Sequence, residues 1–274
     1  MTVFAPRIEA LRQWAVWECK DLAVNLVLAV IAHESGGIIG RPSGEKTPAY
    51  EVLNDAGQPE TVNHAYGLMQ CTPGLLKTWQ ASGKEPKITI DDLRKTDERA
   101  ARCQIALGSW YLANQIRQLY QYDPASFPGA NAGAATPEQI KLALCAYAAG
   151  WGANGNDPAD KGLKPKLDWL KANGHPLTLE MIKKAFPTWG QRENGSWFIQ
   201  PVLYAGSVFS NYLASGGSPL LKAAEQMPQP LAQPLAQPKS DWLKTYWPLL
   251  VLGGIVLISK MGLLKGILGN DKAN

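Results

Sequence analysis

The feature that most constrains the fold of this chain is an almost uninterrupted apolar run from Leu22 to Ala32, which ends in His33-Glu34-Ser35-Gly36-Gly37. Such a run has apolar residues on every face of a helix, so it predicts a helix buried in a core, and the two glycines are a stop signal. Glu34 is therefore expected in the last turn of this helix. Burial and the negative end of the helix dipole both disfavour its charged form, which predicts a raised pKa and suits a general acid.

A simpler alternative treats Glu34 as a solvated residue just past a helix end, paired with Arg41 or Lys46. Structural ion pairs are commoner than catalytic acids, so an isolated glutamate at a helix end favours that alternative. The segments that follow Glu34 in the chain favour the interpretation of Glu34 as a general acid.

Those segments are Ala65-Tyr66-Gly67-Leu68-Met69-Gln70, the helical stretch from Gln104 to Leu112, and Ala146-Tyr147-Ala148-Ala149-Gly150. In this order after Glu34-Ser35 they resemble the soluble lytic transglycosylases, a family with a lysozyme-like (goose-type) fold that cuts the glycan strands of peptidoglycan. The chain departs from the family pattern at four positions. His64 replaces a glycine, Gln104 and Ala148 each replace an asparagine, and Thr61 stands in for a serine.

The resemblance implies a role for each matched residue. Glu34 is the catalytic acid, and the Tyr147 hydroxyl is expected to hydrogen-bond to it. The expected substrate-binding residues are Ser35, which also supports the site structurally, Thr61, Tyr66, Gly67, Met69 and Gln70. In the implied reaction, Glu34 protonates the glycosidic oxygen between N-acetylmuramic acid and N-acetylglucosamine. It then takes the proton of the sugar C6 hydroxyl, which closes a 1,6-anhydro ring, so no second carboxylate, metal or cofactor is expected.

Two rival functions remain open. A hydrolytic lysozyme (muramidase) of similar fold needs a second carboxylate. The long segment from Ile38 to Asn63, predicted as a loop with a short strand pair near residues 50–53 and a turn at residues 55–57, supplies Glu45, Glu51, Asp55 and Glu60. The other rival is a non-catalytic wall-binding component of a phage or secretion assembly.

Other chemistries find little support in the sequence. The histidines His33, His64 and His175 have no recognisable metal-ligand spacing, and Ser35 and Cys71 lack the elbow motif of a hydrolase nucleophile. The four cysteines lack Cys-x-x-Cys spacing, and three of them lie in apolar helical patterns, which favours buried thiols over disulfides. A net charge of +4 argues against a dedicated nucleic-acid binder.

The composition divides the chain into three parts. Residues 1–216 are predicted to form a mainly α, lysozyme-like domain with a small β or loop insertion. Residues 217–241 repeat Pro-Leu-Ala-Gln and predict an extended linker. Residues 242–268 have Trp and Tyr at one end and lysines at the other, as expected of a C-terminal membrane-associated or transmembrane hydrophobic helix.

The location of the protein is predicted from two features together. The N-terminus shows no signal-peptide pattern, yet a wall-cutting enzyme must reach the envelope. This conflict favours a virion-associated protein that is delivered to the bacterial envelope, with a bacterial protein exported by a dedicated system as the alternative. The expected partners are peptidoglycan strands, a membrane, and other virion or secretion-complex proteins.

Overall fold

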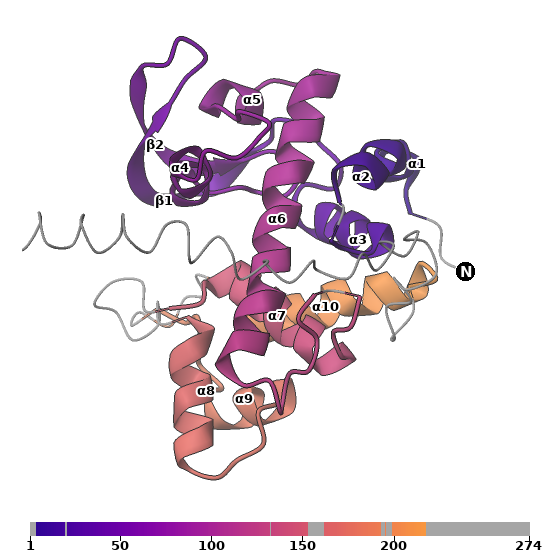
Figure 1. Ribbon diagram of the computed structural model, residues 1–274, viewed down its shortest axis with the longest axis vertical. Coiled ribbons are helices and arrows are strands. Elements are labelled where there is room, and N and C mark those ends of the chain that lie inside the picture. The colour runs from indigo at the N-terminus through magenta and orange to yellow at the C-terminus, as the bar shows by residue number, and fades with distance from the viewer. Residues whose placement is uncertain are drawn as a thin grey trace, which may run out of the picture. The chain divides into compact units, whose positions relative to one another are not determined.

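The computed structural model describes residues 4–19, 21–131, 133–152, 162–192, 195 and 199–217. Within these ranges the protein is mainly α, with ten helices and one antiparallel pair of strands, which confirms the coarse fold prediction (Figure 1). The elements are α1 (Pro6–Glu9), α2 (Arg12–Glu18), α3 (Val24–Glu34), β1 (Pro42–Leu53), β2 (Pro59–Tyr66), α4 (Pro73–Ala81), α5 (Ile90–Arg94), α6 (Glu98–Tyr122), α7 (Pro137–Ala149), α8 (Leu163–Ala172), α9 (Leu179–Ala185) and α10 (Pro201–Ala214).

The predicted linker, apart from residue 217, and the predicted hydrophobic helix at residues 242–268 lie outside the described residues. In the ranges that are described, every helix is too short or too polar to cross a membrane.

Helix α3 forms the centre of the apolar core, as the sequence predicts. Its residues 26–31 are fully buried, and the helix ends at Glu34 with Ser35 as its C-cap. Gly36 and Gly37 follow with φ angles of 61° and 83°, a left-handed conformation in which glycine is favoured. The glycine pair therefore ends the helix and fixes the position of Glu34 at its last turn.

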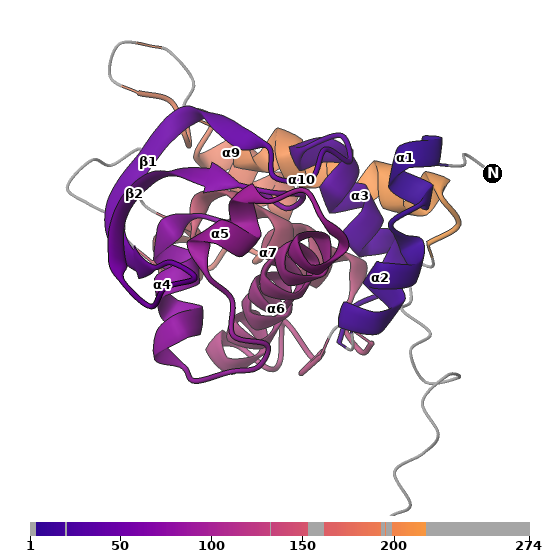
Figure 2. The ribbon, with the colours of Figure 1, turned by 90° about the horizontal axis from the view of Figure 1, so that it is seen from above.

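Helix α6 is the longest of the described helices and runs between two groups of elements. In Figures 1 and 2 the strands, α4 and α5 lie to one side of α6, and α1 to α3 lie to the other. Helix α7 packs against α6, and α10 packs against both α7 and α3. Side chains cap several of these helices, including the predicted Thr136 and Thr178, whose hydroxyls accept hydrogen bonds from Gln139 N and Met181 N.

The segment predicted as a long loop forms a hairpin that is much longer than the expected strand pair. Strand β1 pairs with β2 from Pro42 opposite Tyr66 to Leu53 opposite Pro59, with irregularities between Pro42 and Tyr50. Most of β1 is exposed, so its sequence lacks the alternation of apolar and polar residues by which a strand is recognised. This explains why the sequence indicated only a short strand pair.

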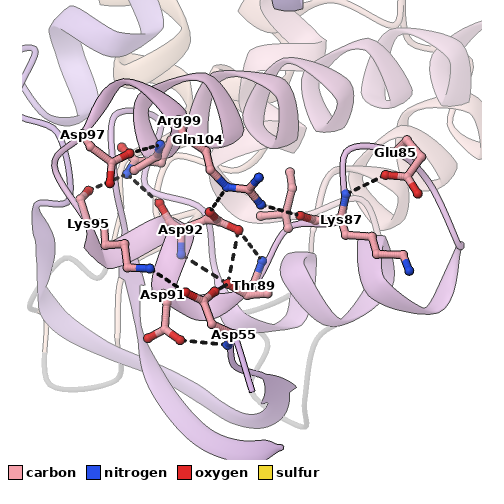
Figure 3. A network of polar contacts seen from close by, with 12 residues as sticks. Asp55, Glu85, Lys87, Thr89, Asp91, Asp92, Lys95, Asp97, Arg99 and Gln104 are labelled. Atoms are coloured by element: carbon pink, nitrogen blue, oxygen red, sulfur yellow. Dashed lines mark hydrogen bonds and ion pairs between the residues drawn. The ribbon is translucent and has the colours of Figure 1, made fainter. Parts of the chain in front are cut away.

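Polar contacts hold the tip of this hairpin against α5 (Figure 3). The carboxylate of Asp55 accepts a hydrogen bond from the Thr89 hydroxyl and lies 2.5 Å from Lys95 Nζ. The backbone N–H of Asp55 donates to Asp91 Oδ2 at 2.8 Å. The Asp55 carboxylate is therefore occupied at the tip of the hairpin.

Candidate active site

Glu34 is an acid with a raised pKa, as the sequence predicts. Its side chain keeps partial access to solvent, yet burial among the surrounding atoms raises the pKa of Glu34 from 4.5 to about 7. At neutral pH a substantial fraction of Glu34 therefore carries a proton that it can donate, a requirement for a general acid.

The partner of Glu34 is Tyr204, which the sequence interpretation missed. The Tyr204 hydroxyl on α10 donates a hydrogen bond of 2.7 Å to Glu34 Oε1 and opposes part of the rise in its pKa. The His33 ring meets the Tyr204 ring edge-on, with 4.7 Å between the ring centroids. The buried Tyr204 is thus fixed from two sides, and it orients the carboxyl group.

The alternative interpretation expects Glu34 to form an ion pair with Arg41 or Lys46, and neither ion pair forms. The guanidinium of Arg41 donates to the Ser35 carbonyl oxygen at 3.1 Å. Lys46 lies in β1, where it is paired in register with His64. Across the described residues Glu34 has no salt bridge, so its charged form is not stabilised by a cation there.

The expected hydrogen bond between Tyr147 and Glu34 is wrong. The Tyr147 hydroxyl donates to the carbonyl oxygen of Met69 at 2.6 Å, and its single proton is used there. Tyr204 occupies the hydrogen-bonding position on Glu34 instead. Tyr147 still lies near the acid, because burial, the Cys71 thiol and Glu34 together raise the pKa of Tyr147 well above its usual value. It positions the turn that carries Met69.

That turn, residues 66–71, is a compact loop beside the acid. Tyr66 and Cys71 exchange both backbone hydrogen bonds, at 2.9 and 3.1 Å. Gly67 has a φ of 86°, and a Cβ there would lie 2.6 Å from the side chain of Gln104. Gln70 adopts a φ of 49°, which is uncommon outside glycine, and its amide nitrogen donates to the Gly67 and Arg41 carbonyl oxygens at 3.0 Å. Such conformations persist only where the surroundings hold them.

Gln104 holds this turn in place from α6. Its fully buried amide oxygen accepts hydrogen bonds from Leu68 N at 2.9 Å and Gly40 N at 3.3 Å. Its amide nitrogen donates to the carbonyl oxygens of Asp92, Leu93 and Lys95 at 3.1 to 3.3 Å. The sequence shows this residue only as a replacement for a family asparagine. The structure makes it the junction between the turn and α5, and Figure 3 shows the α5 side of this junction.

The predicted substrate-binding residues divide into supporting and accessible ones. Ser35 is fully buried, and its hydroxyl donates to Ile31 O and accepts from Gly37 N. Met69 is also fully buried, against Gly108, where a Cβ would lie 2.5 Å from the Met69 Cβ. The prediction that their side chains contact substrate is therefore corrected, because neither reaches the surface. Gly67 is likewise buried in the turn.

Tyr66 and Gln70 are the accessible members of this set, since both side chains are partly exposed in the 66–71 turn beside Glu34. Thr61 is exposed but lies in β2 opposite Glu51, five residues before Tyr66. At the rise of an extended strand that separation is about 17 Å. The structure therefore does not bring Thr61 to the turn.

Three of the four hairpin carboxylates proposed as a second catalytic group are ion-paired. Glu45 pairs with Arg192 at 2.9 Å, Asp55 with Lys95 at 2.5 Å and Glu60 with Arg94 at 2.7 Å. Glu51 is exposed on β1.

The described residues offer neither a metal site nor a reactive thiol. Within the described ranges no group of three or more His, Cys, Asp and Glu side chains is placed to hold a metal ion. The four cysteines are buried free thiols, as the sequence favoured, and burial raises the pKa of Cys19 to about 12. Such thiols are unreactive near neutral pH.

No known protein family, curated protein or solved structure matches this chain. The geometry around Glu34 and the motif resemblance in the sequence are therefore what indicate the chemistry of this site.

Proposed function

We propose that the protein is a lytic transglycosylase with a lysozyme-like domain, which cleaves the β-1,4 bond between N-acetylmuramic acid and N-acetylglucosamine in peptidoglycan. The observation that carries this proposal is the state of Glu34. It sits at the end of a buried helix with a pKa of about 7, and Tyr204 holds one of its oxygens. A single acid that is half protonated near neutral pH suits both proton transfers of this reaction.

In the proposed reaction, Glu34 gives its proton to the glycosidic oxygen as the bond to the muramic acid C1 breaks. The substrate's own N-acetyl group assists at C1. The Tyr204 hydrogen bond stabilises the carboxylate that this step leaves behind. That carboxylate then takes the proton of the C6 hydroxyl, whose oxygen bonds to C1 and closes the 1,6-anhydro ring, so Glu34 ends protonated again.

The ion pairs of the hairpin favour this reaction over hydrolysis. A lysozyme mechanism needs a second carboxylate to activate water or to bond to the sugar, at a defined distance from the first. Glu45, Asp55 and Glu60 are each paired with a cation on another element. Glu51, the fourth candidate, forms no salt bridge among the described residues, so a muramidase remains the alternative outcome of the product measurement.

We also propose that the protein acts from a phage virion and that residues 242–268 associate with a membrane. Detection of the protein in purified virions supports delivery from outside. Its absence there, together with its presence in an exported bacterial fraction, refutes that location and favours the secretion alternative.

The test of the enzymatic proposal is release of soluble fragments from purified peptidoglycan. We expect Glu34→Gln to lose at least about a hundredfold in rate, a typical effect of removing a general acid. Glu180→Gln is the matched control, because it makes the same chemical change at an exposed position on α9, outside the hairpin, and should leave the rate unchanged. If Glu34→Gln digests the wall at the parent rate, the proposed acid is wrong. Peptidoglycan binding without any digestion by the parent protein identifies a wall-binding module instead.

A further inference from the structure

Arg41 lies beside the candidate acid and is held there from two sides. Its guanidinium Nη1 donates to the carbonyl oxygen of Ser35, the C-cap of α3 and the residue next to the acid, at 3.1 Å. Its own carbonyl oxygen accepts from Gly67 N at 2.9 Å and from Gln70 Nε2 at 3.0 Å. The main chain and the side chain of Arg41 are therefore fixed between the end of α3 and the 66–71 turn.

The charge of Arg41 is not neutralised by another side chain. Among the described residues Arg41 forms no salt bridge, and it is exposed to solvent. Glu45, four positions further along the chain, is already paired with Arg192 at 2.9 Å. A guanidinium has five N–H donors in a planar fork, and the bond to Ser35 uses one of them. The remaining donors can bind a ligand.

An unpaired guanidinium at this place favours a carboxylate of the substrate. Arginine binds a carboxylate through two parallel hydrogen bonds, which are stronger than those between neutral groups. In the proposed reaction the two sugars of the strand differ in one group, because N-acetylmuramic acid carries a lactyl ether with a carboxylate and N-acetylglucosamine does not. The proton transfers of Glu34 do not themselves distinguish the two kinds of glycosidic bond. A cation beside the acid supplies that distinction.

We propose that Arg41 is a specificity-determining residue, which binds the lactyl carboxylate of N-acetylmuramic acid and so selects the sugar that is placed at Glu34. This inference rests on the proposed function. A simpler role for Arg41 is to hold the end of α3, because cations stabilise the negative end of a helix. One guanidinium can serve both roles, but only the carboxylate contact depends on the charge of the substrate.

The test compares two forms of one substrate, glycan strands that have been freed of their stem peptides. One form keeps the lactyl carboxylates, and in the other form they are converted to uncharged amides. We expect the parent protein to cleave the carboxylate form with a kcat/KM about tenfold higher, the lower end of what a hydrogen bond to a charged group contributes.

Arg41→Gln should lose this preference through a higher KM on the carboxylate form. The value of kcat should change little, because the contact is the same in the bound substrate and in the transition state. Lys184→Gln removes one exposed positive charge from α9 and is the matched control, which should keep the preference of the parent. Arg41→Lys replaces the planar fork by a point charge and should keep only part of the preference, so it tests the inference if Arg41→Gln does not fold.

Two results with the variants overturn the inference. One is a preference unchanged from the parent, and the other is an equal loss on both forms, which would assign Arg41 to the support of α3 alone. If the parent digests intact peptidoglycan but prefers neither form, the inference is overturned and the proposed function stands. If the parent digests none of the three substrates, the proposed function itself is refuted.

Discussion

Replacing Glu34 with glutamine should make the protein more stable at alkaline pH while it removes activity. The pKa of Glu34 is about 7 in the folded protein and 4.5 as its ordinary value. Between these two pH values the folded state holds a proton that the unfolded chain has released. The stabilisation from this proton is fully present below pH 4.5 and is lost as the pH rises through 7.

The size of the effect follows from the pKa difference. A shift of about 2.5 pH units at 1.36 kcal/mol per unit corresponds to roughly 3 kcal/mol of unfolding free energy. Glutamine is uncharged at every pH and has nearly the same shape, so the variant lacks this dependence. The unfolding free energy of the parent minus that of Glu34→Gln should therefore fall by roughly 3 kcal/mol from pH 4 to pH 9.

Urea unfolding of both proteins at a series of pH values measures this difference. Glu51→Gln serves as the control, because the same substitution at an exposed position should give a difference from the parent that varies little with pH. Parallel curves for the parent and Glu34→Gln would refute the reasoning, since they would mean that folding does not change the proton affinity of Glu34.

Three further predictions follow from the contacts around the acid. Tyr204→Phe removes a donor that lowers the acid's pKa, so the alkaline limb of the pH–activity curve should move to higher pH, whereas Tyr147→Phe should leave that limb in place. Gly67→Ala should lower the unfolding free energy by more than about 2 kcal/mol, and Gly57→Ala by only about 1 kcal/mol. Both glycines have a left-handed backbone, but only at Gly67 would the added Cβ clash with a neighbouring side chain, that of Gln104. Chemical denaturation measures both differences. Gln104→Met should cost about 3 kcal/mol in the same assay, because it leaves several buried backbone groups unpaired.

Local features of the site could be predicted from the sequence because they depend on neighbouring residues. The apolar run and the glycine pair fix the end of α3, and burial there is enough to predict the raised pKa of Glu34. Thr136 and Thr178 cap their helices as expected, since a cap is a contact between residues three positions apart.

The contacts that complete the site join distant parts of the chain. Tyr204 and Glu34 are separated by 170 residues, and no local pattern indicates which tyrosine reaches the acid. The sequence suggested Tyr147 by resemblance, and only the packing of α10 against α3 and α7 explains the exchange of partners. The hairpin was underestimated for a different reason, because a largely exposed strand leaves no apolar alternation to detect.

The most direct test of the proposed reaction is mass spectrometry of the fragments that the parent protein releases from purified peptidoglycan. We expect saccharides that end in 1,6-anhydro-N-acetylmuramic acid, one water molecule lighter than the hydrolysis products, and none of them from Glu34→Gln. Fragments with ordinary reducing ends would contradict it and identify a muramidase, in which a second carboxylate acts together with Glu34.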